Sequence, residues 1–363
     1  MTQIVRDRRA LHAIPEVEWH LPLTSEYVKT SLQKLRCRVF SPVDTAVCAF
    51  FDFGAEEAIG FRADMDALPI PEKTELSFAS THPGKMHACG HDGHMAILLE
   101  LARRLDKKEK LNHNVLLIFQ PGEESPGGAR RICDTGVLEQ YRVKSVFGLH
   151  LWPALEKGKV FCRANELMSR ASEVSVDVYG KSSHIGNAAA GIDATAAAVE
   201  IYRIAREAEA DFPEHVFRLL NFGKFHSGTV RNALSAHARM EGSLRAFQDE
   251  VFDKLQRSIG EAAARVEEKY GCRVELTFGD SYPAVMNDPA LLERVKQAVP
   301  VEQLEKPTMT AEDFSWYQRT VGGIFFFLGL GDVPALHATN FDFDESILEK
   351  GADFFEKLAE DFR

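Results

Sequence analysis

The two ends of the chain share one pattern, in which short apolar runs alternate with segments of helical spacing. Continuous apolar runs are typical of strands buried on both faces of a sheet, and the helical segments between them are typical of the helices that cover those faces. The runs cover 58–63, 115–119, 146–149 and 324–328, and the helical segments cover 2–12, 24–36 and 95–105. We therefore predict an α/β domain with a mostly parallel sheet and helices on both faces.

The middle of the chain differs, because apolar and polar residues alternate there one by one. Val174, Val176 and Val178 would face one side of a strand, and the polar residues between them the other. Further strands are predicted over 215–225, 236–246 and 274–278, and helices over 193–209 and 249–270. The order β-α-β-β-α-β is that of a ferredoxin-like α+β fold. We predict that 170–283 is an inserted domain, within a larger domain made of 1–169 and 284–363.

Composition and charge narrow the class of protein. The chain has 363 residues, 45% of them hydrophobic, and its formal net charge is -11. An acidic chain without a basic tract is a poor nucleic-acid binder. Its longest apolar runs are far shorter than the about 20 residues of a membrane span, and the charged N-terminus does not resemble a signal peptide. We therefore expect no nucleic acid, no membrane and a cytoplasmic location.

Polar residues that can bind metals follow the predicted buried strands. Asp66 follows the run at 58–63, Glu123 and Glu124 follow the run at 115–119, His150 follows the run at 146–149, and the run at 324–328 leads towards His337. In an open parallel α/β sheet, ligands bind beyond the carboxyl ends of the strands. We therefore expect these side chains to share one site.

A second cluster is the segment Cys89–His94, which we place in a loop just before the helix at 95–105. Cys89 and His91 are two residues apart, and two glycines allow a tight backbone. Thiolate, imidazole and carboxylate together suit zinc, manganese, cobalt or nickel. The alternative is a thiol in an ordinary turn with surface histidines, which the other strand-end residues disfavour.

Glu123 and Glu124 are adjacent, so a turn can direct their carboxylates to different tasks. One could bind metal while the other acts as general base on a metal-activated water. The alternative is a solvated acidic turn. The inserted domain contains three further candidates, His184, Asn232 and Arg245. Considered alone, each would be interpreted as an ordinary surface residue.

These residues belong to motifs that resemble the amidohydrolase branch of the M20 metallopeptidases. That branch includes hippurate hydrolases, auxin-conjugate hydrolases, N-acyl-amino-acid deacylases and N-acetyldiaminopimelate deacetylases. The matching segments are 11–16, 61–69, 85–94, 119–124, 148–150, 228–232, 241–245 and 311–314.

The resemblance implies a role for each candidate residue. Glu123 would be the general base, Asp66 would orient the centre, and His184 would polarise the scissile carbonyl across a dimer. Asn232 would assist, and Arg245 could hold a substrate carboxylate. The inserted domain would be a lid that also forms a homodimer. The ligands of two divalent ions (Zn, Mn, Co or Ni) would be Cys89, His91, Glu124, His150 and His337.

The chain departs from the family pattern at two places. The stretch after His184 lacks the usual Pro-His pair, and the usual Pro-Ala-Glu-Glu-Gly is here Pro-Gly-Glu-Glu-Ser at 121–125. Both changes leave the carboxylates Glu123 and Glu124 in place. The first puts the usual substrate specificity in question.

The function predicted from these observations is hydrolysis of the amide bond of N-acyl amino acids, N-acetyl foremost, or of related amines. A metal-bound hydroxide would attack, with Glu123 as general base. Three alternatives remain open at this point: a dipeptidase of the same family, a hydrolase with Cys89 as nucleophile, and a non-catalytic relative that binds metal and ligand.

Overall fold

The computed structural model describes residues 1–279 and 281–363, which form two compact units. The first unit contains Met1–Leu167, Val285–Pro307 and Glu312–Arg363, and the second contains Met168–Ala284 and Thr308–Ala311. The last of these segments, which the sequence pattern assigned to the larger domain, lies beside the start of the insertion. Its Thr310 carbonyl accepts a hydrogen bond from the backbone N–H of Ser169 at 2.8 Å.

The first unit is built on a sheet with the strand order β1-β2-β4-β3-β5-β14-β6-β13. The strands β4, β3, β5 and β14 at its centre are parallel, and β2 joins β4 in the antiparallel sense. The prediction of a mostly parallel sheet is confirmed. The strands are β1 (Arg38–Phe40), β2 (Val47–Phe51), β3 (Ala58–Asp64), β4 (Asn114–Gln120), β5 (Val143–Pro153), β6 (Val160–Cys162), β13 (Glu302–Gln303) and β14 (Gly323–Gly331).

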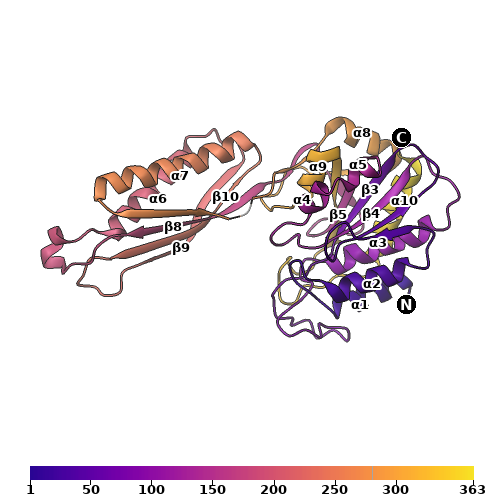
Figure 1. Ribbon diagram of the computed structural model, residues 1–363, viewed down its shortest axis with the longest axis horizontal. Helices are drawn as coiled ribbons and strands as arrows, with labels where there is room; N and C mark the ends of the chain where they lie inside the picture. Colours follow the sequence, from indigo (N-terminus) through magenta and orange to yellow (C-terminus); the bar gives the residue numbers. More distant parts are fainter. Residues whose placement is uncertain (280) are drawn as a thin grey trace. The chain divides into compact units, whose positions relative to one another are not determined.

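Helices cover both faces of this sheet (Figure 1). Val115, Leu117 and Phe119 of β4 join the core beneath α3 and α10, whereas the intervening Leu116 and Ile118 are buried on the other face. This explains why the strand is a continuous apolar run. On the first side lie α1 (Gln3–His12), α2 (Pro22–Leu32), α3 (His91–Leu105), α8 (Pro289–Ala298) and α10 (Ile347–Asp361); the remaining helices of this unit are α4 (Ala129–Asp134), α5 (Val137–Gln140) and α9 (Ser315–Val321).

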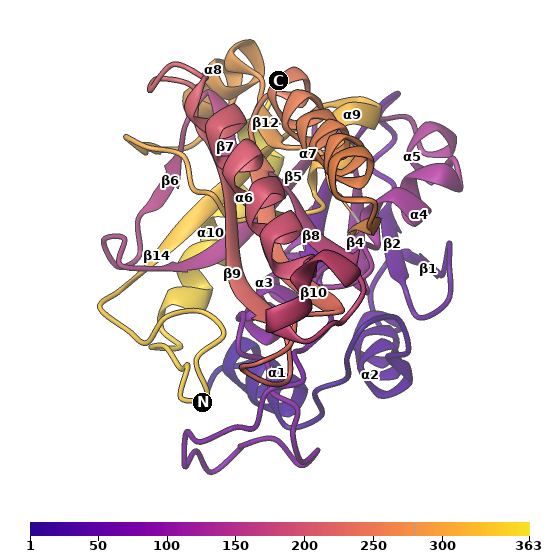
Figure 2. The same cartoon turned by 90° about the vertical axis from the view of Figure 1, so that its left-hand side faces the viewer.

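The second unit is an antiparallel sheet with the strand order β11-β8-β10-β9 and two helices packed on one face (Figure 2). Val176 of β8 lies opposite Met240 of β10, and both are fully buried beneath those helices. The ferredoxin-like prediction is confirmed. The elements are β8 (Arg170–Tyr179), α6 (Ala194–Ala210), β9 (Arg218–Ser227), β10 (His237–Ala246), α7 (Asp249–Tyr270) and β11 (Arg273–Phe278), and a two-stranded ribbon pairs β7 (Asn165–Met168) with β12 (Val285–Asn287).

Within 1–279 and 281–363, no helix combines the length and the apolar character that a membrane span needs.

Candidate active site

The helix α3 begins earlier than the sequence pattern predicts. It starts at His91, so His91–His94 form its first turn and not a loop before it. Gly90 precedes the helix with a φ of 86°, in the left-handed region that glycine adopts readily. The prediction was wrong here because His91, Asp92 and His94 are polar but buried, which hides the helical pattern.

Two buried histidines, His91 and His150, are held so that Nε2 remains available to a ligand. Nδ1 of His91 lies 2.8 Å from the carbonyl oxygen of Asp66, and Nδ1 of His150 lies 2.7 Å from that of Leu151. A carbonyl oxygen only accepts, so each Nδ1 carries a proton. Nε2 of His91 has no hydrogen-bond partner although it is buried, and Nε2 of His150 lies 3.4 Å from Sγ of Cys89.

The other predicted ligands complete this group. Nε2 of His337 lies 3.2 Å from Oε1 of Glu124, and the His337 backbone N–H donates to the Ala88 carbonyl at 2.8 Å. His337 has a φ of 65°, a strained backbone conformation for a residue with a side chain. The contact with Ala88 ties this strained residue to the chain just before Cys89.

The donor atoms suit divalent metal ions. Ligand atoms lie within 4.8 Å of one another in overlapping groups that include Cys89 with His91 and His150, and Cys89 with Glu124 and His337. Sulfur, nitrogen and carboxylate oxygen are the donors expected for zinc and similar ions. The structure thus brings together all five sequence-predicted ligands.

Charge in this cluster also favours a cation. Burial opposes protonation of His91, but the carboxylates of Asp64, Asp66 and Glu124 raise its pKa to about 10. A metal ion must therefore displace a proton from this ring, which makes metal binding weaker at lower pH.

Glu123 and Asp66 lie beside the ligands. The carboxylate of Asp66 accepts hydrogen bonds from the backbone N–H groups of Glu123 (2.9 Å) and Glu124 (3.0 Å), and so holds the turn that carries both. Burial, followed by the negative charges of Glu312 and Glu124, raises the pKa of Glu123 well above its usual range. Such a carboxylate can accept a proton and keep it.

His94 and Asp92, to which the sequence assigned no role beyond shaping the segment, hold it in place through hydrogen bonds. Nε2 of His94 accepts the backbone N–H of Leu151 at 2.9 Å and Nδ1 donates to Asp64 at 2.6 Å, so neither nitrogen is free for a metal. Asp92 accepts from Arg8 at 2.9 Å and from Nδ1 of His12 at 2.8 Å.

A buried ionic network next to Glu123 was missed by the sequence analysis. Its centre is Arg62 of β3, with 2% of its surface exposed. The segment 311–314, which contains Glu312 and Asp313, matches the family pattern, but the sequence analysis assigned these two residues no role. The signal that could have revealed the network is Arg62 itself, a charged residue within the apolar run at 58–63. The partners of Arg62 are Asp64, Gln120, Glu312 and Asp313.

Comparison with known proteins agrees with this geometry. The family model described as Peptidase family M20/M25/M40 matches residues 60–361. The chain belongs to this family. The predicted resemblance is thereby confirmed, and the protein is a metal-binding hydrolase of the M20 type.

The similarity to individual relatives extends over almost the whole chain. A protein named "uncharacterized hydrolase" of Staphylococcus epidermidis is 32% identical over 98% of this chain and 97% of its own. A crystal structure from methicillin-resistant Staphylococcus aureus has a TM-score of 0.90 at 28% identity, covering 98% of this chain and 96% of that one. The Bacillus subtilis protein YxeP, described as a dinuclear metal-binding peptidase of the M20 family, has a TM-score of 0.84 at 29% identity with the same coverage.

The three remaining residues named by the M20 resemblance lie in the second unit. His184 is exposed, and its Nδ1 accepts the backbone N–H of Gly186 at 3.1 Å. Asn232 is exposed, and its carbonyl accepts the N–H of Ile185 at 3.1 Å. Arg245 donates to the carbonyl of Met309 and, at 3.1 Å, to Ser243. Their roles stay predictions.

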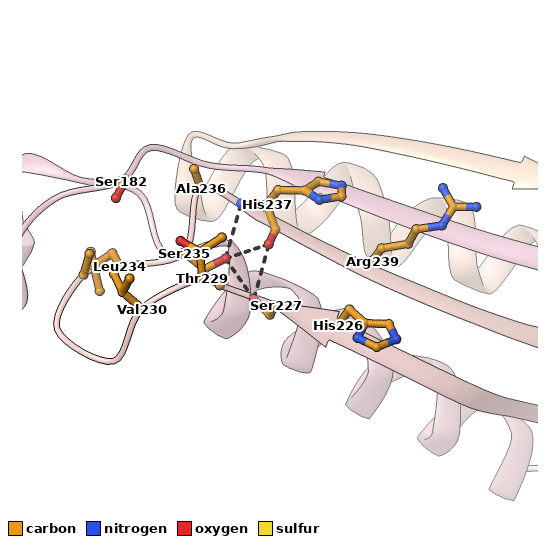
Figure 3. A pocket seen from close by; sticks show the side chains of 12 residues that line it. Ser182, His226, Ser227, Thr229, Val230, Leu234, Ser235, Ala236, His237 and Arg239 are labelled. Atoms are coloured by element: carbon orange, nitrogen blue, oxygen red, sulfur yellow. Dashed lines mark hydrogen bonds between the residues drawn. The ribbon is translucent and has the colours of Figure 1, made fainter.

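The second unit also has a hollow of about 350 Å³ (Figure 3). Ser235 links its walls, accepting from Ser227 at 2.9 Å and donating to the carbonyl of His237 at 2.6 Å. His184, Asn232 and Arg245 do not line this hollow, so it does not mark their predicted site.

Proposed function

We propose that this M20 hydrolase cleaves the amide bond that links an acyl group, N-acetyl foremost, to an amino acid or related amine. Two divalent ions would be held by Cys89, His91, Glu124, His150 and His337. The observation that carries the proposal is the state of His91 and His150, which are both fixed through Nδ1 and offer Nε2 to the same group of donors as Cys89.

Glu123 would act as the general base. Its buried carboxylate accepts the proton of the attacking water and later gives it to the amine that leaves. Asp66 fixes the backbone of Glu123 and so keeps this carboxylate in place. When bound, the divalent ions would supply Lewis-acid activation of the water and of the amide carbonyl.

A homodimer is part of the same proposal. The strand β9 lies at the edge of the second unit's sheet, and an edge strand offers unpaired backbone groups to another chain. Exposed apolar side chains lie on β9 and on the neighbouring α6: Phe225 is 43% exposed, Val199 48% and Tyr202 41%. A second copy could cover them, and His184, with Asn232, would then serve the substrate of its partner while Arg245 holds a substrate carboxylate.

A cysteine nucleophile is disfavoured by the surroundings of Cys89. Burial and the carboxylates of Glu124 and Glu123 raise the pKa of its thiol well above its usual range. The nucleophilic form is the thiolate, which this environment suppresses unless a cation is present.

The test is amine release from N-acetyl, N-benzoyl and N-succinyl amino acids, assayed with Zn²⁺, Mn²⁺, Co²⁺ or Ni²⁺. We expect a chelator to abolish activity and added metal to restore it. Dipeptides assayed in parallel would reveal a dipeptidase. The proposal fails if the metal-loaded protein leaves every N-acyl amino acid intact, or if a thiol reagent inactivates it while chelators do not.

A further inference from the structure

The buried guanidinium of Arg62 lies between the two sets of residues that make up the candidate metal centre. One set consists of histidines on α3 and β5, and the other consists of carboxylates on the loop after β4. We propose that Arg62 is a positioning residue that joins these two sets, so that they bind metal as one unit. This inference rests on the proposed metal-dependent function.

The connection to the histidines runs through Asp64. Arg62 Nη1 donates to Asp64 Oδ2 at 2.6 Å, and Asp64 Oδ1 accepts from Nδ1 of His94 at 2.6 Å. Nε2 of His94 then accepts the backbone N–H of Leu151. The carbonyl of the same Leu151 holds Nδ1 of His150, so the ring orientation of a proposed ligand depends on this chain of hydrogen bonds.

The connection to the carboxylates runs through Asp313. Arg62 Nη2 donates to Asp313 Oδ1 at 2.9 Å, and Asp313 Oδ2 accepts the backbone N–H groups of Gly128 (2.7 Å) and Ala129 (2.8 Å). These residues close the loop that begins at Pro121 and carries both glutamates. A Cβ atom on Gly128 would lie 1.8 Å from the Pro121 carbonyl oxygen, so the two ends of the loop are in direct contact.

Arginine is suited to this place because its planar group donates in several fixed directions. Besides Nη1 and Nη2, Nε of Arg62 donates to Oε1 of Gln120 at 2.9 Å, and Gln120 in turn donates to Asp313 at 2.8 Å. A lysine would keep the positive charge but could not hold these partners in the same geometry. Charge and geometry can therefore be separated by substitution.

The first experiment compares zinc binding by the wild type, Arg62→Lys and Arg62→Met, using competition with a chromophoric chelator. Loss of a residue that orients metal ligands weakens affinity about 10–100-fold. We expect both variants to show such a loss. If Arg62→Lys keeps the wild-type affinity, Arg62 acts only as a charge and the inference is overturned.

Asn114→Ala is the matched control for a loss of stability. Asn114 is also buried and holds backbone groups of Phe53 and Ala55, but it lies at the opposite end of β4 from Gln120. We expect it to lower the unfolding midpoint and leave zinc affinity unchanged. Zinc affinity that falls equally in this variant would mean that general destabilisation explains the result.

A double-mutant cycle tests the joining role directly and does not require Arg62→Met to fold. Asp64→Asn and Asp313→Asn each remove one ionic partner while keeping the shape of the side chain. If Arg62 joins the two sets, their effects on zinc affinity are non-additive, because the second substitution acts on a connection that the first has already broken. Additive effects overturn the inference. Wild-type protein that binds no zinc would instead overturn the proposed function.

Discussion

At the scale of single residues, two adjacent glutamates have different surroundings. Glu124 lies 3.2 Å from His337, whereas Glu123 is near other carboxylates and has a raised pKa. Burial also acts to raise the pKa of Glu124, but His337 and the charge of His91 outweigh it and lower the pKa. An ionised carboxylate suits a metal ligand, and a proton-accepting one suits a base.

This difference predicts the outcome of two matched substitutions. Glu123→Gln keeps the side-chain shape but cannot accept a proton, so we expect kcat to fall by about 10²–10⁴ with unchanged metal content. Glu124→Gln should lose metal. Steady-state kinetics together with metal analysis of each purified variant would check this, and equal metal loss in both would contradict it.

His12 predicts a pH dependence of stability. Its ring lies between Asp92 (2.8 Å) and Glu72 (3.2 Å), so both nitrogens carry protons. Burial acts to lower the pKa of His12, but its hydrogen bonds with these carboxylates outweigh burial and raise the pKa to about 9. The unfolded value is about 6.5, so the stabilisation, about 3 kcal/mol, is complete below that pH and is lost as pH rises towards 9.

Urea unfolding at about pH 6 and at pH 9.5 would measure this contribution. The wild type should lose more stability between these pH values than His12→Gln does. His215→Gln, at an exposed histidine, is the control and should follow the wild type. An equal pH dependence in the wild type and His12→Gln would show that the ion pair contributes nothing.

Individual site residues could be predicted where they follow an apolar run. The candidate ligands were found from the strands that precede Glu124 and His150 and from the spacing of Cys89 and His91. The link between Arg62 and Asp313 could not be found in this way. It depends on which strands become neighbours, and the two residues are 251 positions apart.

At the scale of elements, the first turn of α3 is packed so closely at Gly93 that no side chain larger than that of glycine fits there. A Cβ atom on Gly93 would lie 2.6 Å from Cδ1 of Leu151 and 2.9 Å from the ring of Phe343. Leu151 follows the proposed ligand His150, so a displacement there would reach the site.

Gly93→Ala and Gly260→Ala therefore form a matched pair within helices. Gly93→Ala should destabilise the protein by about 1–3 kcal/mol through overpacking and should weaken metal binding. A Cβ atom on Gly260, in α7, would meet nothing within 4 Å, so this substitution should stabilise the protein by up to about 1 kcal/mol. Chemical unfolding measures the change in the free energy of unfolding for each variant. If both changes have the same sign, the packing argument is refuted.

Elements with a clear period could be predicted well, and their ends less well. The helix at 249–270 was predicted with the bounds that the structure shows. The start of α3 was missed because its first turn is polar and serves the site. The antiparallel strand β2 was not predicted, although its five residues, Val47–Phe51, form a continuous apolar run like the one at 115–119.

At the scale of the whole molecule, the proposed homodimer predicts the effect of charges on one surface. Tyr202→Glu combined with Phe225→Glu should give a monomer in sedimentation experiments, because a carboxylate on each element would have to be buried between two copies. If His184 acts across the dimer, this variant should also lose activity while keeping its metal.

Met286→Glu is the control for that experiment. Met286 is 39% exposed and lies in the first unit, so its substitution should leave the oligomeric state unchanged. A double variant that sediments like the wild type would show that the surface on α6 and β9 is not the interface.

The insertion could be recognised from its change of period, but its link to the distant segment 308–311 could not. That segment is four residues long and pairs with Met168 through a single bridge at Thr308. Pairing of this kind leaves no pattern in a sequence.

The presence of one sulfur atom among the proposed ligands makes the site visible to optical spectroscopy. A thiolate bound to cobalt(II) transfers electron density to the metal when it absorbs near-ultraviolet light, whereas imidazole and carboxylate ligands give no such band. Cobalt loading of this protein would therefore produce a near-ultraviolet absorption band that reports directly on Cys89, and Cys89→Ser would remove that band. Because the Sγ atom lies 3.4 Å from Nε2 of His150, the same absorbance would follow the geometry of the centre as substrates bind.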